Sequence, residues 1–193
     1  MTCSRTDDVF VVVDATALDG DLTARCTPPR DELTGVDALE AAGFSVTGVA
    51  RFGRSFTCRI DGEPSPDRED CADTPPTSAY WSYWTADAGS CTWTYATAGA
   101  ATTTPGAGAV EGWSFALDAG TGDAPPPAMT PCQARADATV GSARAASSAT
   151  LAGGPGVDPW VAAGALVLLV AIGALAARRR RRRRATPHDG DAA

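Results

Sequence analysis

Short apolar runs bounded by turn-forming residues mark the first 118 residues of this chain. Runs rich in β-branched and aromatic residues predict strands. These predicted strands lie at residues 10–14, 22–26, 45–49, 55–60 and 113–117. Together with one helix and an aromatic hairpin, they give the order β-β-α-β-β-β-β. This order predicts an α+β fold in which the helix packs on a mixed or antiparallel sheet.

The helical signal lies in the segment TGVDALEAAGF, which begins at residue 34. Thr34 is a good N-cap residue, and Asp37 three positions later completes a weak capping box. Val36 and Leu39 follow the helical period, and Gly43 is placed to end the helix.

Residues 80–95 (YWSYWTADAGSCTWTY) hold three of the five tryptophans and all three tyrosines. The segment predicts a hairpin of two β-prone stretches, 80–85 and 91–97, around the turn ADAGS. If Thr85 pairs with Cys91, the six rings divide between the two faces of the hairpin. One face then holds Trp81, Tyr83, Trp93 and Tyr95, and the other holds Tyr80 and Trp84.

Large aromatic side chains on both faces exceed what one small core needs. One interpretation is that both faces are covered and every ring is core; the other is that some rings form a binding surface. On the second interpretation, the four-ring face is mostly core, and Tyr80, Trp84 and Trp113 are partly exposed at its edge. The candidate ligand-binding residues are Tyr80, Trp81, Tyr83, Trp84 and Trp113.

Beyond residue 118 the composition changes. Residues 119–157 are rich in Pro, Ala, Gly, Ser and Thr without an apolar period, which predicts a disordered stalk. Residues 160–177 are apolar and uncharged, and as a helix they would span about 27 Å, which predicts one transmembrane helix within residues 158–177. Seven arginines follow at 178–184, so we expect a cytoplasmic tail at residues 178–193 and the domain of residues 1–118 outside the cell.

This topology predicts a single-pass protein of the cell membrane. A sortase substrate has a similar tail, but LAGGP at residues 151–155 lacks the threonine of that motif. Export requires a signal segment, and the chain opens on polar residues. We therefore expect either that the gene starts upstream or that the tail inserts after translation.

Charge is strongly segregated along the chain. Residues 1–159 carry nine arginines against twenty-one Asp and Glu, a balance of −12, within a net charge of −7 for the whole chain. Nucleic acid requires a basic footprint, so this acidic body argues against a nucleic-acid partner.

Six cysteines in a chain with one histidine predict disulfides rather than metal or thiol chemistry. That histidine, His188, lies in the expected tail, so we expect no catalytic residue, no metal site and no cofactor. Cys58 and Cys71 flank a short Pro-containing loop, and a bond between them would restrict the unfolded chain by about 3 kcal/mol. The other two pairings stay open, and Cys3–Cys132 would fasten the two ends of the domain.

Several motifs follow one another in order, and together they carry a resemblance. They are the helix VDALEAAGF, the strand SFTCRIDGEP, Cys71 before TPP, the aromatic hairpin, an ATAGA turn and VEGWSF. Over residues 9–115 the chain resembles the transcobalamin C-terminal-like domain family, and within it the membrane-anchored actinobacterial branch. The resemblance implies a β-grasp-like fold with one helix that binds a soluble ligand, with the aromatic strand and the VEGW segment nearest that ligand.

The function that this resemblance implies is capture of a small molecule outside the cell for a vitamin-uptake transporter complex, with cobalamin as the leading candidate. The large helical partner domain of the vitamin carriers has no counterpart in this sequence. The alternatives are a cell-surface adhesion or wall-polysaccharide-binding module, whose aromatic rings would stack on sugars, and a structural or regulatory ectodomain of a transporter complex.

Overall fold

The computed structural model describes residue 3, residues 5–119 and residues 123–138. Over these ranges the chain forms a small α+β fold with a mixed sheet and two helices, which confirms the predicted fold class. The strands are β1 (Val9–Asp14), β2 (Leu22–Thr27), β3 (Val46–Val49), β4 (Gly53–Ile60), β5 (Ala79–Ala86), β6 (Thr94–Tyr95) and β7 (Val110–Leu117). The helices are α1 (Gly35–Ala41) and a second at residues 131–138, and a 3₁₀ turn, η1 (Thr16–Leu18), follows β1.

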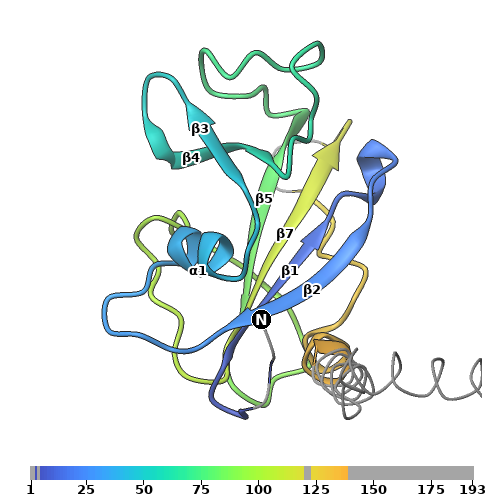
Figure 1. Cartoon of the computed structure of the whole chain (residues 1–193). Coiled ribbons are helices and arrows are strands. Elements are labelled where there is room, and N and C mark those ends of the chain that lie inside the picture. The colour runs from blue at the N-terminus through green and yellow to red at the C-terminus, as the bar shows by residue number, and fades with distance from the viewer. Residues whose placement is uncertain (1–2, 4, 120–122, 139–193) are drawn as a thin grey trace, which may run out of the picture. The chain divides into compact units, whose positions relative to one another are not determined.

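The main sheet has the strand order β2-β1-β7-β5-β6, and β3 and β4 form a separate hairpin (Figure 1). β1 and β7 pair in parallel, while the other neighbours pair antiparallel. All six residues of β1 and all of β7 except Leu117 are buried. An unbroken apolar run such as VFVVV at residues 9–13 is typical of a strand that is covered on both faces.

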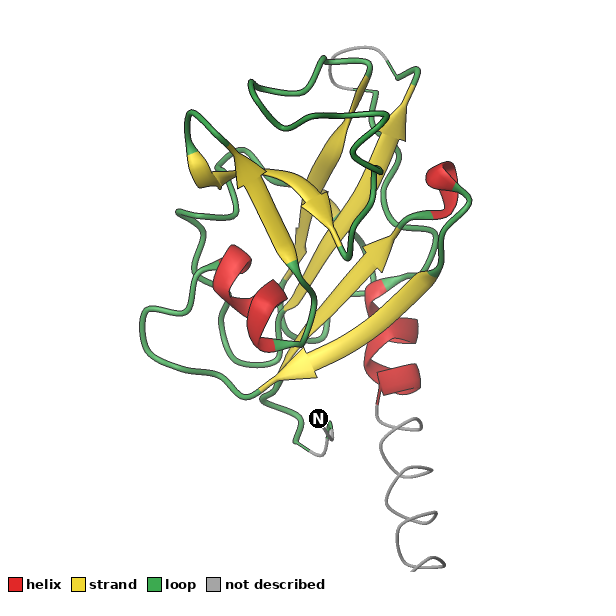
Figure 2. Cartoon of the chain, turned by 45° about the horizontal axis from the view of Figure 1, so that its top comes forward, coloured by secondary structure: helices red, strands yellow, loops and turns green. Residues whose placement is uncertain are grey.

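Two separate cores cover the two faces of this sheet. Val9, Val11 and Val13 of β1 belong to one core with Leu39 of α1. Phe10 and Val12, which point to the opposite face, belong to a second core. Ala134 and Ala138 of the second helix lie in that second core, so the sheet is enclosed between α1 and the helix at 131–138 (Figure 2).

Two expectations are corrected by this second helix. The sequence predicts one helix and a disordered stalk at residues 119–157, yet residues 123–138 are folded against the sheet. Ala128 N–H donates to the buried carboxylate of Asp14 at 2.8 Å. The helix begins with a capping box, since Thr130 N–H donates to Gln133 Oε1 at 2.9 Å and Gln133 N–H donates back to Thr130 Oγ1 at 3.3 Å. No apolar period marks this helix, because its inward residues are alanines.

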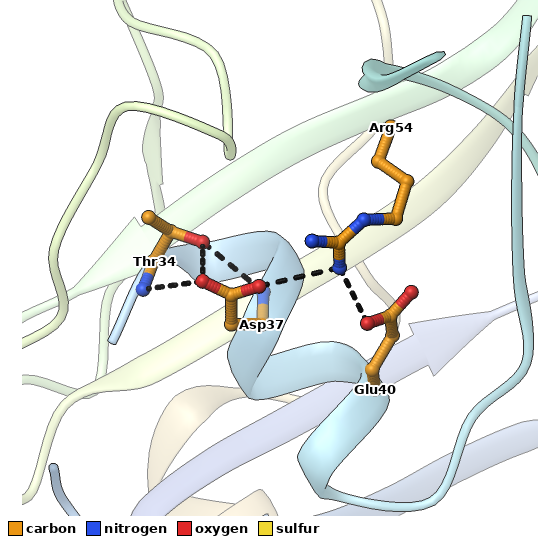
Figure 3. Close-up of polar contacts among 4 residues, drawn as sticks. All are labelled: Thr34, Asp37, Glu40 and Arg54. Carbon is orange, nitrogen blue, oxygen red and sulfur yellow. Dashed lines mark hydrogen bonds and ion pairs between the residues drawn. The ribbon is translucent and has the colours of Figure 1, made fainter. Parts of the chain in front are cut away.

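The capping box predicted for α1 is confirmed (Figure 3). Asp37 N–H donates to Thr34 Oγ1 at 3.2 Å, and the Thr34 hydroxyl donates to Asp37 Oδ2 at 2.6 Å. Arg54 of β4 reaches across and donates to Asp37 and Glu40, which ties the β3–β4 hairpin to the helix. The hydrogen bond from Thr34 is the largest of the causes that hold the pKa of Asp37 below its usual value; Arg54 adds to it.

Three disulfides are present, and the predicted Cys58–Cys71 bond is confirmed, with its Cα atoms 5.8 Å apart. Cys3 bonds Cys26, and Cys91 bonds Cys132. The suggested Cys3–Cys132 pairing is therefore wrong. Cys132 lies at the start of the second helix and secures it to the loop before β6, whereas Cys3 lies beside the end of β2.

Much of the C-terminal part of the chain lies outside the described residues. This applies to the expected stalk from residue 139, to the membrane span at 160–177 and to the arginine-rich tail. Within the described ranges, no helix has the length and the apolar character needed to cross a membrane.

Arg135 of the second helix supplies the first testable prediction. Its guanidinium donates to the backbone carbonyls of Asp87 and Ser90, both at 2.9 Å, and to that of Gly108 at 3.3 Å. Arg135→Ala should lower the free energy of unfolding by about 2 kcal/mol, because charged hydrogen bonds to three loop carbonyls are lost. Urea unfolding measures this change, and Asp137→Ala on the exposed side of the same helix is the control, with an effect within about 0.5 kcal/mol. Equal effects of the two substitutions would show that the helix does not hold these loops.

Candidate functional site

The aromatic hairpin forms with a register that differs from the predicted one. Trp84 pairs with Tyr95 and Thr85 with Thr94, whereas the prediction placed Cys91 opposite Thr85. The loop is longer than ADAGS because residues 87–91 are held by the second helix through Arg135 and the Cys91–Cys132 bond. The predicted four-ring face is therefore wrong.

Trp81 and Tyr83 point to the face covered by α1, where β7 rather than β6 supplies their partners. The Trp81 and Phe115 rings meet edge to face at 5.3 Å, and the Tyr83 and Trp113 rings lie 5.0 Å apart. Trp81 is 7% exposed and Trp113 is 1% exposed. Both were candidate ligand-binding residues, and Trp113 was expected at an exposed edge; the structure places them in the core instead.

Trp93 lies on the opposite face, against Gly112 of β7. A Cβ atom on Gly112 would approach the indole ring of Trp93 to 2.8 Å, so only glycine leaves room for this ring. The Trp93 indole N–H donates to the Met129 carbonyl at 2.9 Å. Trp93 therefore anchors the segment before the second helix.

The remaining rings gather on that face at the outer edge of the sheet. The Trp84 and Tyr95 rings are perpendicular, with their centroids 5.0 Å apart. The Trp84 indole N–H donates to Ser82 Oγ at 2.9 Å, and the Ser82 hydroxyl donates to the carbonyl of Ser114 at 2.7 Å. This chain of contacts fixes the Tyr95 ring against the buried part of the sheet.

Tyr80 completes the group, because its hydroxyl lies 3.4 Å from that of Tyr95. Burial, with a further contribution from Tyr95, raises the pKa of Tyr80 to about 12. The Tyr80 hydroxyl therefore stays protonated near neutral pH, where it can donate and accept hydrogen bonds.

A pocket of about 220 Å³ opens beside these two tyrosines. Its walls are Phe56, Pro75, Thr77, Tyr80 and Tyr95. Phe56 is 37% exposed and Tyr95 is 40% exposed, which makes them two of the four large apolar side chains exposed in the described part of the chain. No lining residue is charged, and the polar atoms that side chains bring to the wall are three hydroxyl oxygens. Such a lining suits an uncharged ring and offers no nucleophile with an adjacent base.

The pocket lies where the sheet ends. β6 pairs only with Trp84 and Thr85, and the last backbone bond across this edge runs from Ala96 N–H to the Tyr83 carbonyl. The first half of β5, which carries Tyr80, has no strand outside it among the described residues. At this edge the two tyrosine side chains share the pocket wall with Phe56 of β4 and with Pro75 and Thr77 of the loop before β5.

Of the predicted ligand residues, only Tyr80 lines this pocket. Trp84 does not line the pocket, but its ring packs edge to face on the ring of Tyr95, which does. Phe56, Pro75 and Thr77 also line the pocket, and the sequence did not predict them as site residues. The local sequence predicts only a strand around Phe56. Its contact with the pocket of Tyr80 depends on how the β3–β4 hairpin packs, which local sequence does not encode.

A larger hollow of about 710 Å³ lies between residues 27–33 and α1. Its charged lining consists of Arg30, Asp31, Glu32, Asp37 and Glu40. Asp37 and Glu40 are already paired with Arg54, so this is a solvated, acidic surface of the helix. Within the described ranges, no three His, Cys, Asp or Glu side chains are grouped so that they could hold a metal ion.

Glu111 is a buried carboxyl group in the core of the described domain. It is 1% exposed in β7 and accepts a hydrogen bond from the Tyr83 hydroxyl. Gly35 at the start of α1 packs so closely on this pair that a Cβ there would overlap the Tyr83 hydroxyl and lie 2.9 Å from Glu111 Oε2. Burial raises the pKa of Glu111 to about 7, and the hydrogen bond from Tyr83 acts in the opposite direction. Glu111 thus belongs to the packing of α1 on the sheet, away from the pocket lining.

Comparison with known proteins gives one family match. A family model described as the SCO2322-like domain matches residues 73–152, which is less than half of the chain. The match includes β5, β6, β7 and the second helix. No curated protein and no solved structure matches. The resemblance to the transcobalamin C-terminal-like family stays a prediction.

The second prediction concerns the pH dependence of stability. The folded protein keeps the Glu111 proton up to about pH 7, whereas the unfolded chain loses it near 4.5. The contribution of this group is therefore fully present below pH 4.5 and is lost as the pH rises through 7. Glu111→Gln does not titrate, so the free energy of unfolding of the wild type relative to this variant should fall by about 3 kcal/mol over that interval.

Urea unfolding of both proteins from pH 4 to pH 8 measures this difference. Thr104→Ala, at an exposed loop position without a titratable group, is the control and should give a flat difference. A flat difference for Glu111→Gln as well would contradict the assignment.

Proposed function

We propose that this chain is an extracytoplasmic ligand-binding module anchored in the membrane, and that the pocket at the outer edge of β5 is its binding site. The observation that carries the proposal is the pocket itself, where Phe56, Tyr80 and Tyr95 offer three aromatic rings to solvent at one place. Burial of a ligand ring against such side chains gains apolar contact at a small cost in side-chain entropy.

The size of the pocket limits what enters it. An apolar cavity of about 150 Å³ holds one benzene molecule, so a pocket of about 220 Å³ takes one ring with its substituents or two small fused rings. A corrinoid such as cobalamin would insert one flat group and leave the rest outside. Cobalamin, taken up for a vitamin transporter, remains the leading candidate on the strength of the sequence resemblance.

The strand arrangement supports the finer fold assignment within this proposal. The first and last strands, β1 and β7, pair in parallel inside the sheet, and antiparallel neighbours flank them. A helix, α1, packs across one face. This is the arrangement expected of a β-grasp-like domain, the fold that the resemblance implies.

The membrane anchor rests on the sequence alone. The apolar run at residues 160–177 and the seven arginines after it support a single span with the domain outside the cell. Protease added to intact cells should remove the domain and leave a protected C-terminal fragment, detected through a tag after residue 193. A full-length product that resists protease until the cells are lysed would contradict this topology.

The binding proposal is tested by calorimetry with the full-length chain in detergent. Cobalamin should bind saturably, and Phe56→Ala should weaken binding about tenfold, because the exposed ring contributes contact to the ligand and little to the core. Phe52→Ala is the matched control, since Phe52 is 49% exposed on the same hairpin but outside the pocket. Loss of binding in both variants, or in neither, would contradict the assignment of the site. Binding of wall polysaccharide in place of cobalamin would support the adhesion alternative.

A further inference from the structure

The two tyrosine hydroxyls give the pocket a chemical selectivity that its aromatic walls alone would lack. We propose that the pocket selects a flat heteroaromatic ring without a negative charge, with the ring against Phe56 and Pro75 and a nitrogen or oxygen at its rim hydrogen-bonded to Tyr80 and Tyr95. This proposal rests on the proposed function and names the class of ligand group that occupies the same site.

The hydroxyl pair has unused hydrogen-bonding capacity. Its oxygens are 3.4 Å apart, beyond the usual range of about 2.5–3.0 Å for an O–H to O bond, so the interaction between them is weak. Each hydroxyl has one donor and two acceptor sites, so the pair can bind a polar atom between them without giving up a strong internal bond.

The geometry of the pair is fixed in advance by buried groups. Tyr95 is held edge to face by Trp84, which is held by Ser82, which is in turn bonded to the Ser114 carbonyl in the middle of the sheet. Ser82 and Ser114 are 1% and 4% exposed. Because this support is rigid, little side-chain entropy is lost when a ligand binds, which is the condition for selectivity at a small site.

Anionic rings are excluded by the same lining. No wall residue carries a positive charge, so an anion would lose hydration without a partner. A saturated apolar ring is not excluded but gains nothing from the hydroxyls. The pocket volume, enough for one or two small fused rings, completes the description of the ligand group.

The test uses three probes of similar shape with the full-length chain in detergent. Benzimidazole carries rim nitrogens, indene lacks them, and benzoate is an anion. Calorimetric titration of each probe into the same detergent solution without protein gives the background that arises from partition into the detergent. Relative to this background, the wild type should bind benzimidazole about fivefold to tenfold more tightly than indene, the effect of one or two hydrogen bonds, and should bind benzoate more weakly than either.

Tyr80→Phe and Tyr95→Phe keep the rings and remove one hydroxyl each. Both should lower benzimidazole affinity to near that of indene while leaving indene affinity and the melting temperature unchanged. Equal affinity of the wild type for benzimidazole and indene, or a preference that survives both substitutions, would overturn the selectivity while the ring-binding site stands. Binding of neither probe above the background would overturn the proposed site itself. Saturation by methyl α-glucoside without benzimidazole binding would assign the pocket to a sugar ring and also overturn the inference.

Discussion

The parallel pairing of β1 with β7 is the constraint on which the rest of this domain depends. It joins the first strand to the last strand inside the sheet, with Phe10 opposite Val110 and Val13 opposite Trp113. Both strands carry apolar side chains on both faces, so neither face can be left to solvent. The fold therefore needs two covers, and it takes them from opposite ends of the described chain: α1 from residues 35–41 and the second helix from residues 131–138.

The need to cover both faces of the sheet explains the excess of aromatic residues better than a binding surface alone does. Trp81 and Trp113 fill the core under α1, and Trp93 fills the core on the other side. Most of the rings are thus covered on one face or the other, and a binding role for the remaining rings stays a prediction. The rings that remain accessible are those at the outer edge of β5, where β6 is only two residues long. The candidate site arises where the sheet stops rather than on a dedicated surface.

The sequence predicts those structural features that depend on neighbouring residues. It does not predict features that depend on contacts between segments far apart in the chain. The capping box of Thr34 and Asp37 lies within four residues, and so α1 and its start were predictable. The Cys58–Cys71 bond closes a short loop and was predictable for the same reason. The hairpin register was not, because the length of its loop is set by Arg135 and Cys132, more than 40 residues away. The second helix was missed because its inward residues are alanines, although Thr130, Pro131 and Gln133 form a recognisable helix start. The unbroken apolar run VFVVV carried a signal for a sheet covered on both faces.

The stability of the fold and the accessibility of the site place opposite demands on β5. Its central residue Tyr83 faces Glu111 and Gly35 in a contact so close that glycine is required, and burial there raises the pKa of the carboxyl group. One residue further, Trp84 points the other way and supports Tyr95 at the pocket. Because successive residues of a strand point to opposite faces, one strand can be rigid in the core and still present a fixed aromatic wall to a ligand. Substitutions at Tyr83 and Gly35 should therefore act on stability first, whereas those at Tyr80 and Tyr95 should act on ligand selectivity, and this separation follows from the alternation along β5.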